Sequence, residues 1–442
     1  MSQSKSQYVA IGLMLFALFF GAGNLIFPVS MGQAAGENVW WAVLGFCLTG
    51  VGMPLICVVA MGYSGCRDLQ EAASRVHPIY GIFFTLMVYL SIGPCLAMPR
   101  TGTVAFEIAI RPFLSGDAVD LGLPIFLAIF FAVSCWLAAT PNRMVDRIGK
   151  MLTPLLLAAI FVLLGKSFMT PMGEFMAPTA AYAEPAKAAI QGILDGYNTL
   201  DALASFVFAY LIINAVVSMG VTDPKEISSQ VIKSGTLAVG LLAFVYVLLA
   251  KLGAESVQAI GMQDTGAGVL TMSTNYLLGQ FGMAILAVIV LLACLTTCVG
   301  LISCCAAFFQ KLTNVSNYKS WCVFFAIFIF CVGMFGLKVL ISAAIPVLMF
   351  VYPLAVALIA LLLLDKTFGG ARVVYVSTTA FTFVMALCNG LETAGVSLGV
   401  IGQFFVDYIP LHTVGMGWVG FAIVGYIVGL VLKNTGCKCC KG

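Results

Sequence analysis

Charged residues are scarce in this 442-residue chain: aspartate, glutamate, lysine and arginine together make up 9% of it, against about 25% in ordinary globular proteins. Hydrophobic residues account for 62%, and the mean hydropathy is +1.08. A soluble globular chain is thereby excluded. The apolar runs are long enough to cross a bilayer, which takes about 20 residues each. Because these runs are continuous and do not alternate with polar residues, they also exclude a membrane β-barrel. The sequence therefore predicts an all-α polytopic membrane protein.

Signatures of enzymes and motors are missing as well. There are two histidines and no His/Cys cluster at metal-ligand spacing, which argues against a metal or redox enzyme. No GxxxxGK[ST] loop, GxSxG or HExxH motif occurs, so neither an ATP-driven motor nor a hydrolase is indicated. The 15 cysteines lie mostly in apolar segments and act there as small hydrophobes. For the tail cysteines Cys437, Cys439 and Cys440, a solvated, reduced tail is the main interpretation, and metal binding or acylation is the alternative.

Hydropathy predicts about twelve membrane spans, the first of them an uncleaved anchor. If the N-terminus is cytoplasmic, all but six of the 21 basic residues fall on the inner side, which supports an even number of spans and cytoplasmic termini. Segment 220–233 on that side is either a short interfacial helix or a plain loop. The expected spans are about 8–32, 39–63, 78–98 (or to 110), 121–140, 148–168, 190–219, 234–252, 281–309, 320–336, 339–364, 372–389 and 411–432.

The first span contains residues that interrupt a helix. Gly21, Gly23, Asn24 and Pro28 follow closely on one another, and such residues are unfavourable in a helix interior. In hydrocarbon, the freed backbone groups must find partners, so a break is tolerated where it lines a cavity and can hold an ion or substrate. The alternative is a close helix–helix contact through small residues.

The sixth span has polar residues at the matching place, including Asp201. It comes five spans after the first, and five is odd, so the two would run in opposite directions, as in an inverted-topology repeat with its site between the interrupted helices. The chain then divides into a first five-helix repeat, an outer loop, a second five-helix repeat, and two last helices with the tail. A second long outer connection, 253–280, lies with that loop over the outer mouth. The four segments are 1–168, 169–189, 190–364 and 365–442.

Four further side chains are candidates. Asp201 either meets a substrate ammonium, a cation or a proton, or caps the second half of its helix. Thr296 and Thr297 either present hydroxyl oxygens to a hard cation together with carbonyls freed in the first span, or bond back to their own helix. Arg100 lies seven residues before Glu107 on one helical face, where we expect a structural ion pair at the outer end, with a gate as the alternative.

The first motif also carries a resemblance. GLMLFALFFGAGNLIFP (12–28), followed by AGEN (35–38), resembles the bacterial branched-chain amino acid:cation symporters, the BrnQ (LIVCS) family. The segments IGP (92–94), MPRT (98–101), 196–204 and LTT (295–297) are similar to its other signatures, and the likeness runs over nearly the whole chain. The resemblance implies a LeuT-like fold of the amino acid–polyamine–cation superfamily, with two inverted five-helix repeats and two C-terminal helices. It also implies sodium-driven import of leucine, isoleucine and valine across the bacterial cytoplasmic (inner) membrane.

The resemblance implies roles for individual residues. Amides at the break of the first span take the substrate carboxylate, which a helix N-terminus favours, and the sixth span completes the pocket. A second sodium site would involve Asn24, but Thr199 and Asp201 compete for its next ligand, so stoichiometry stays open. Where relatives have a gating arginine after the asparagine, Leu25 and Ile26 stand here, so the outer gate must be built differently. The expected substrate residues are Gly21, Ala22, Gly23, Asn24, Asp201, Ala202, Leu203, Ala204, Ser205 and Phe206; the expected sodium ligands are Ala17, Phe20, Ala293, Thr296 and Thr297.

The sequence thus predicts a secondary transporter that works by alternating access, with no cofactor, and with sodium and branched-chain amino acids as its partners. Methionine is a further candidate substrate, because one methylene discriminates by only about 1–3 kcal/mol. A proton-coupled transporter using Asp201 is the first alternative, and a membrane sensor that binds amino acids without moving them is the second. No feature indicates nucleic-acid binding.

Overall fold

The computed structural model describes residues 5–66, 68–116, 118–140, 151–218, 224–313 and 317–435. Within these ranges the chain is almost entirely helical and contains no strand. Seven helical stretches there are long and apolar enough to cross a membrane, and four shorter apolar helices accompany them. The all-α membrane class is confirmed. The number of twelve spans stays a prediction, because several expected spans are joined into one helix or divided between two.

The first span is broken at Gly21, whereas Gly23, Asn24 and Pro28, which were also expected to interrupt it, lie inside the next helix. Helix α1 (Lys5–Phe19) ends before Gly21, and α2 (Ala22–Ala35) begins after it. Phe20 still donates its amide to the Phe16 carbonyl at 2.7 Å, but Gly21 is extended, with φ −116° and ψ −158°. The Gly21 amide instead donates to Asn24 Oδ1 at 3.2 Å. The asparagine side chain therefore caps the second half of the interrupted span.

The sixth span is also divided. Helix α10 (Pro185–Tyr197) and α11 (Asp201–Ser218) are separated by three residues. Leu200 has a positive φ of 67°, a left-handed conformation that ends a helix and is unusual for a residue with a Cβ. The Asp201 amide donates a weak hydrogen bond to Thr199 Oγ1, which lies within the break, at 3.4 Å. The two expected interruptions are thus both present.

The third span is kinked. It consists of α6 (Pro78–Leu90), a π-helical turn η3 (Ser91–Cys95) and α7 (Ala97–Ala109). Gly93 has non-helical angles next to Pro94, which lacks an amide donor. The other helices of this half are α3 (Val39–Cys47) with the π-helical η2 (Leu48–Gly52), α4 (Met53–Ser64), α5 (Leu69–Ser74), α8 (Ala118–Ala138) and α9 (Thr153–Met169).

Two segments of the second half differ from expectation. Segment 220–233 is no separate interfacial helix: from Pro224 it is the beginning of α12 (Pro224–Ile260), and its first residues lie outside the described ranges. Connection 253–280 is largely helical, because α12 continues past the Lys251–Glu255 ion pair to Ile260 and α13 (Gly266–Thr313) starts six residues later, bending at Gly279. The remaining helices are α14 (Tyr318–Gly333), α15 (Leu337–Leu364), α16 (Arg372–Thr393), α17 (Val400–Tyr408) and α18 (Trp418–Asn434).

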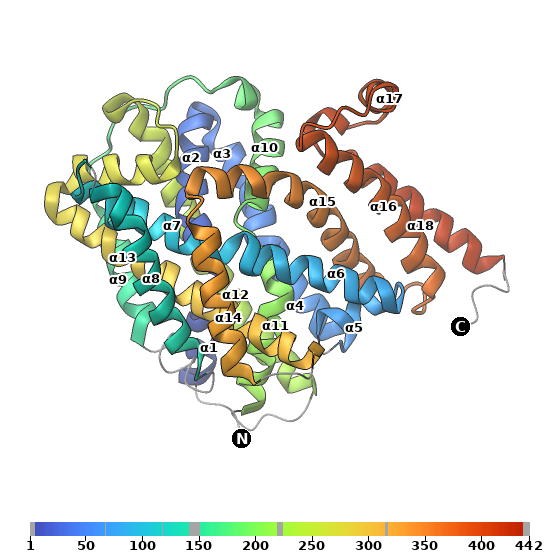
Figure 1. Ribbon diagram of the computed structural model, residues 1–442. Helices are drawn as coiled ribbons and strands as arrows, with labels where there is room; N and C mark the ends of the chain where they lie inside the picture. The colour runs from blue at the N-terminus through green and yellow to red at the C-terminus, as the bar shows by residue number, and fades with distance from the viewer. Residues whose placement is uncertain are drawn as a thin grey trace.

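Helix α1 lies inside the bundle. Its residues Leu15, Phe16, Ala17 and Leu18 are fully buried, and α9, α11, α12 and α13 all contact it. A helix that is apolar on every face is expected to be enclosed in this way. In Figure 1, α16 and α18 lie together on one flank of the bundle, away from α1.

Glycines bring the elements around the breaks into close contact. A Cβ on Gly32 of α2 would overlap the Ala250 carbonyl of α12, and one on Gly253 of α12 would overlap the Val29 carbonyl of α2. Gly45 of α3 and Gly192 of α10 stand in the same reciprocal relationship. Backbones approach this closely only where side chains are missing. The half-helices that flank the site are therefore fixed by backbone contact.

Candidate substrate and ion sites

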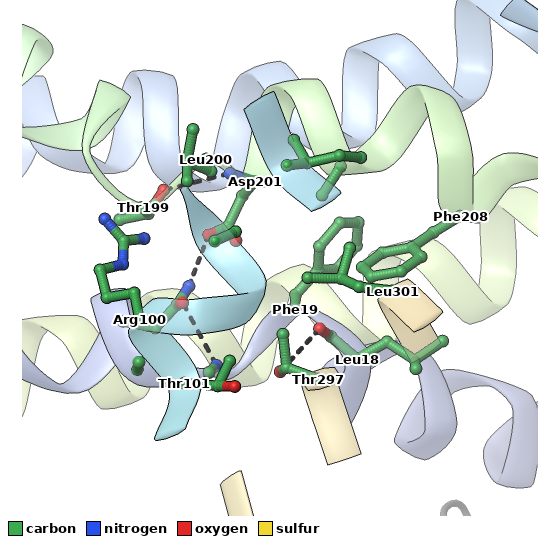
Figure 2. A pocket seen from close by; sticks show the side chains of 17 residues that line it. Leu18, Phe19, Arg100, Thr101, Thr199, Leu200, Asp201, Phe208, Thr297 and Leu301 are labelled. Atoms are coloured by element: carbon green, nitrogen blue, oxygen red, sulfur yellow. Dashed lines mark hydrogen bonds between the residues drawn. The ribbon is translucent and has the colours of Figure 1, made fainter. Parts of the chain in front are cut away.

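The two helix breaks meet at one pocket. Residues on both sides of the first break line it, together with residues of the sixth-span break and of α11 and side chains from α7 and α13. Figure 2 shows how the labelled residues surround it. The space that a water molecule can enter is about 20 Å³, room for about one water. Side chains or half-helices must therefore move before the pocket can admit an amino acid.

A hydrogen-bonded group of three buried side chains joins the breaks. Asn24 Nδ2 donates to Asp201 Oδ2 at 2.6 Å, and Tyr246 Oη donates to the same oxygen at 2.9 Å. Asn24 Nδ2 also contacts Tyr246 Oη. These residues come from α2, α11 and α12, so one carboxylate oxygen links three helices. Since Asn24 also caps α2, a change in the charge of Asp201 acts directly on the first break.

The pocket has a polar end and an apolar end. Arg100, Thr199 and Asp201 lie at one end in Figure 2, whereas Phe19, Phe208 and Leu301 lie at the other. Arg100 and Asp201 carry opposite charges and are 3% and 2% exposed. A ligand that fits this division has a zwitterionic head and an aliphatic side chain.

The two threonines of α13 face carbonyls of α1. Thr296 Oγ1 lies 2.9 Å from the Ala17 carbonyl oxygen and 3.0 Å from those of Leu292 and Ala293. Thr297 Oγ1 donates to the Leu18 carbonyl at 3.0 Å. One hydroxyl has a single proton and can serve only one of these oxygens at a time, so the cluster holds more acceptors than donors. Neutral oxygens in this arrangement fit a hard cation.

The Thr296 hydroxyl approaches carbonyls of its own helix and of the first span, so the bond within its helix is present. Its role toward a cation stays a prediction. Of the expected sodium ligands, Ala17, Ala293, Thr296 and Thr297 come together. Phe20 follows at the break, and the Leu18 carbonyl, which was not expected, is the one that Thr297 contacts most closely.

The expected substrate residues divide by helical face. Gly21, Ala22, Gly23 and Asn24 line the pocket. On α11, Asp201, Ala204 and Phe208 line it, because residues three and four apart share a face. Other residues of α11 are buried on other faces, and their roles toward a substrate stay predictions; they are Ala202, Leu203, Ser205 and Phe206.

The expected pairing of Arg100 with Glu107 is wrong. Glu107 pairs with Arg111, four residues on, whereas Arg100 is buried in the pocket. Side chains three or four residues apart are neighbours on a helix, whereas Arg100 lies seven residues before Glu107 on α7, too far along the helix for a direct pair.

Two other contributors were missed by sequence reasoning. Tyr246 sits in an uninterrupted apolar run, where tyrosine gives no sign of a polar partner. Phe208 shares the helical face of Asp201, and this spacing of seven residues was the signal that identifies it in place of Phe206. The tail cysteines lie outside the described residues, within which no group of three metal-binding side chains occurs.

Comparison with solved structures shows the fold. The crystal structure of MhsT in complex with L-phenylalanine has a TM-score of 0.57 and 16% identity, and the match covers 98% of both chains. The structure of Mhp1, a nucleobase-cation-symport-1 family transporter, has a TM-score of 0.62 and 14% identity, covering 98% of this chain and 93% of that one. Both are LeuT-fold transporters, so the LeuT-like fold is confirmed.

Comparison with sequences shows the family. The branched-chain amino acid permease BrnQ of Bacillus subtilis (strain 168) is 43% identical over 430 residues, 97% of each chain. The branched-chain amino acid permease BraB of the same strain is 44% identical over 424 residues, covering 96% of this chain and 95% of the relative. The family profile described as branched-chain amino acid transport protein matches residues 4–436. This chain is a member of the branched-chain amino acid transport protein family.

Proposed function

We propose that this protein imports leucine, isoleucine and valine, with methionine as a further substrate, by sodium symport with alternating access. The observation that carries the proposal is that Thr297 belongs both to the pocket and to the oxygen cluster between α1 and α13. Its side chain lines the pocket, and its hydroxyl donates to the Leu18 carbonyl in the oxygen cluster. An ion bound in that cluster would therefore order the wall of the substrate pocket. The membrane is the bacterial cytoplasmic membrane, with both termini on the cytoplasmic side.

The substrate pose follows from the polarity of the pocket. The first amides of α2 have no intrahelical partners and attract an anion, so the substrate carboxylate binds beside Ala22 and Gly23. The ammonium binds toward Asp201 and the carbonyls at the end of α10. The aliphatic side chain lies against Phe19, Phe208 and Leu301. Burying a branched side chain contributes about 1.5–3 kcal/mol. Leucine, isoleucine and valine differ by one methylene at most, so the pocket does not separate them sharply.

The coupling follows from what each ligand connects. Sodium ties the carbonyl end of α1 to α13 through Thr296 and Thr297. The amino acid ties the amide end of α2 to α11. With both ligands bound, the interrupted first span is held on both sides of its break. Its two halves then move as a unit when the protein changes between its outward and inward states.

Proton coupling is the second candidate, and one observation favours it. Asp201 is a fully buried carboxyl whose Oδ2 already accepts two hydrogen bonds. Protonation of that group would weaken both bonds and release Asn24. The two candidates share a substrate and differ only in the ion.

Substrate counterflow in proteoliposomes separates transport from sensing. Vesicles loaded with unlabelled leucine should take up labelled leucine when sodium is present on both sides. Binding of leucine by the detergent-solubilised protein without any counterflow would indicate a sensor and contradict the proposal.

A further inference from the structure

Arg100 occupies an unusual place between the two helix breaks. It comes from α7, beyond the kink at Gly93, and its side chain is 3% exposed. A Cβ added to Gly23 would lie 2.8 Å from Arg100 Nη2 and 3.2 Å from the carbonyl oxygen of Asn198. One guanidinium nitrogen therefore reaches the start of α2 and approaches the unwound segment between α10 and α11. Figure 2 shows the guanidinium near Thr199, at the polar end of the pocket.

The charge of this arginine is not matched by a direct ion pair among the described residues. Among the described residues, no carboxylate lies within salt-bridge distance of it, and its buried Nε has no hydrogen-bond partner. The guanidinium carbon lies over the ring of Phe27, 5.2 Å from its centroid. Asp201 lies in the same pocket, but its Oδ2 serves Asn24 and Tyr246. An unpaired buried charge is costly, so the site is built for a partner that comes from outside the chain.

The surroundings define the chemistry of that partner. Arginine offers a planar set of donors that matches a carboxylate in bidentate geometry. The N-terminus of α2, directly beside Nη2, attracts negative charge as well. Gly23 has no Cβ, which is what leaves room for the guanidinium against the helix start. Two independent sources of positive potential thus converge on one point of the pocket.

We propose that Arg100 binds the α-carboxylate of the amino acid substrate together with the first amides of α2. This inference rests on the proposed function and names its recognition residue. Arg100 and Asp201 then bracket the zwitterionic head, the arginine at the carboxylate and the aspartate at the ammonium. The guanidinium selects for a free carboxylate and discriminates against alcohols and amides with the same side chain.

Competition binding tests the selection. Labelled leucine is bound to purified protein in sodium buffer. Unlabelled leucine and leucinol, which lacks the carboxylate, are then added separately as competitors, and the affinity of each is measured. In Arg100→Gln the leucine affinity should fall about 100-fold, as expected for loss of a buried charge-assisted pair, while the leucinol affinity changes little. Arg100→Lys should keep part of the preference for leucine over leucinol. Arg111→Gln, which removes a half-exposed arginine paired with Glu107, is the matched control and should keep all of it.

A second measurement needs no variant at the site. Solid-state NMR on wild-type protein with ¹⁵N-arginine and [1-¹³C]leucine should show a carboxylate–guanidinium contact within about 4 Å, the reach of a charge-assisted hydrogen bond. The inference is overturned if no such contact is seen, or if Arg100→Gln keeps the preference for leucine over leucinol. If wild-type protein binds leucine but shows no counterflow, the proposed function fails while the role of Arg100 stands.

Discussion

Asn24 Nδ2 lies 2.6 Å from Asp201 Oδ2, so the two interrupted helices are joined by one hydrogen bond between side chains 177 residues apart in sequence. The Oδ1 atom of the same asparagine accepts a hydrogen bond from the Gly21 amide. A single side chain thereby connects the break between α1 and α2 with the break between α10 and α11.

Replacing Asp201 with Asn separates the two coupling ions. An amide oxygen still accepts hydrogen bonds but has no charge and cannot carry a proton. Sodium coupling predicts that Asp201→Asn keeps sodium-driven leucine uptake with the apparent affinity weakened about tenfold or more, the effect of hydrogen bonds to a charged group worth about 1.5–3 kcal/mol. Asp407→Asn, an exposed residue of α17 bonded to Gln403, is the control. If Asp201→Asn folds normally but takes up no leucine, proton coupling would be favoured over sodium coupling.

Removing the Thr297 hydroxyl weakens the oxygen cluster. Thr297→Ala should raise the sodium concentration for half-maximal uptake about tenfold, since each lost ligand of a hard cation lowers affinity, whereas Thr297→Ser should stay near wild type. Thr236→Ala is the control, because that exposed hydroxyl bonds only to its own helix at Ile232. Unchanged sodium activation in Thr297→Ala would remove the residue from the ion site.

Two glycines of α12 test the packing of the broken span. Gly253→Ala places a Cβ on the Val29 carbonyl of α2, and such overpacking costs about 1–3 kcal/mol. Gly240 on the same helix faces open space, so Gly240→Ala is neutral or stabilising by up to about 1 kcal/mol. Thermal unfolding in detergent should show a lower Tm for the first variant only. Equal Tm values would mean that α2 and α12 can move apart without cost.

The pair of Asp68 and Lys311 predicts a pH dependence. Burial alone would raise the Asp68 pKa, but hydrogen bonds from Lys311 and from the backbone of Glu71 outweigh it, so the pKa lies below its ordinary value of 3.8. A carboxylate whose pKa is lower in the folded state than in the unfolded state stabilises the fold at pH values above its unfolded-state pKa. This contribution is lost as the pH falls through the folded-state pKa. The pair is partly exposed, so its contribution is at most about 1 kcal/mol.

The Tm difference between wild type and Lys311→Gln should therefore be small and constant from pH 8 to pH 5, and shrink only below the ordinary pKa of 3.8. A difference that disappears between pH 8 and pH 5 would assign the effect to another group.

The helix breaks were predictable from sequence for a local reason. Gly21 is a poor helix former in an apolar run, and its effect does not depend on distant contacts. Gly23 and Pro28 were expected to act in the same way, but they are helical residues of α2. The position of Asp201 after a break was visible for the same reason. The approach of Thr296 to carbonyls of the first span was one of two interpretations that the residues allowed, beside a bond within its own helix, and the family resemblance favoured it.

The side chains that complete the pocket depend on helix direction and phase, which a single sequence does not carry. Arg100 enters the pocket because the kink at Gly93 directs α7 there. Tyr246 reaches Asp201 because α12 packs against the broken span. Phe208 lines the pocket and Phe206 does not because Leu200 fixes where α11 begins and hence its phase. Of these, the positions of Arg100 and Phe208 are related to backbone angles at single residues, Gly93 and Leu200.

The most direct test is leucine accumulation by purified protein in proteoliposomes under one imposed gradient at a time. The account predicts accumulation with an inward sodium gradient in the absence of a proton gradient, and its loss when sodium is replaced by potassium. Accumulation with an inward proton gradient alone would contradict sodium coupling and move the ion chemistry from Thr296 and Thr297 to Asp201.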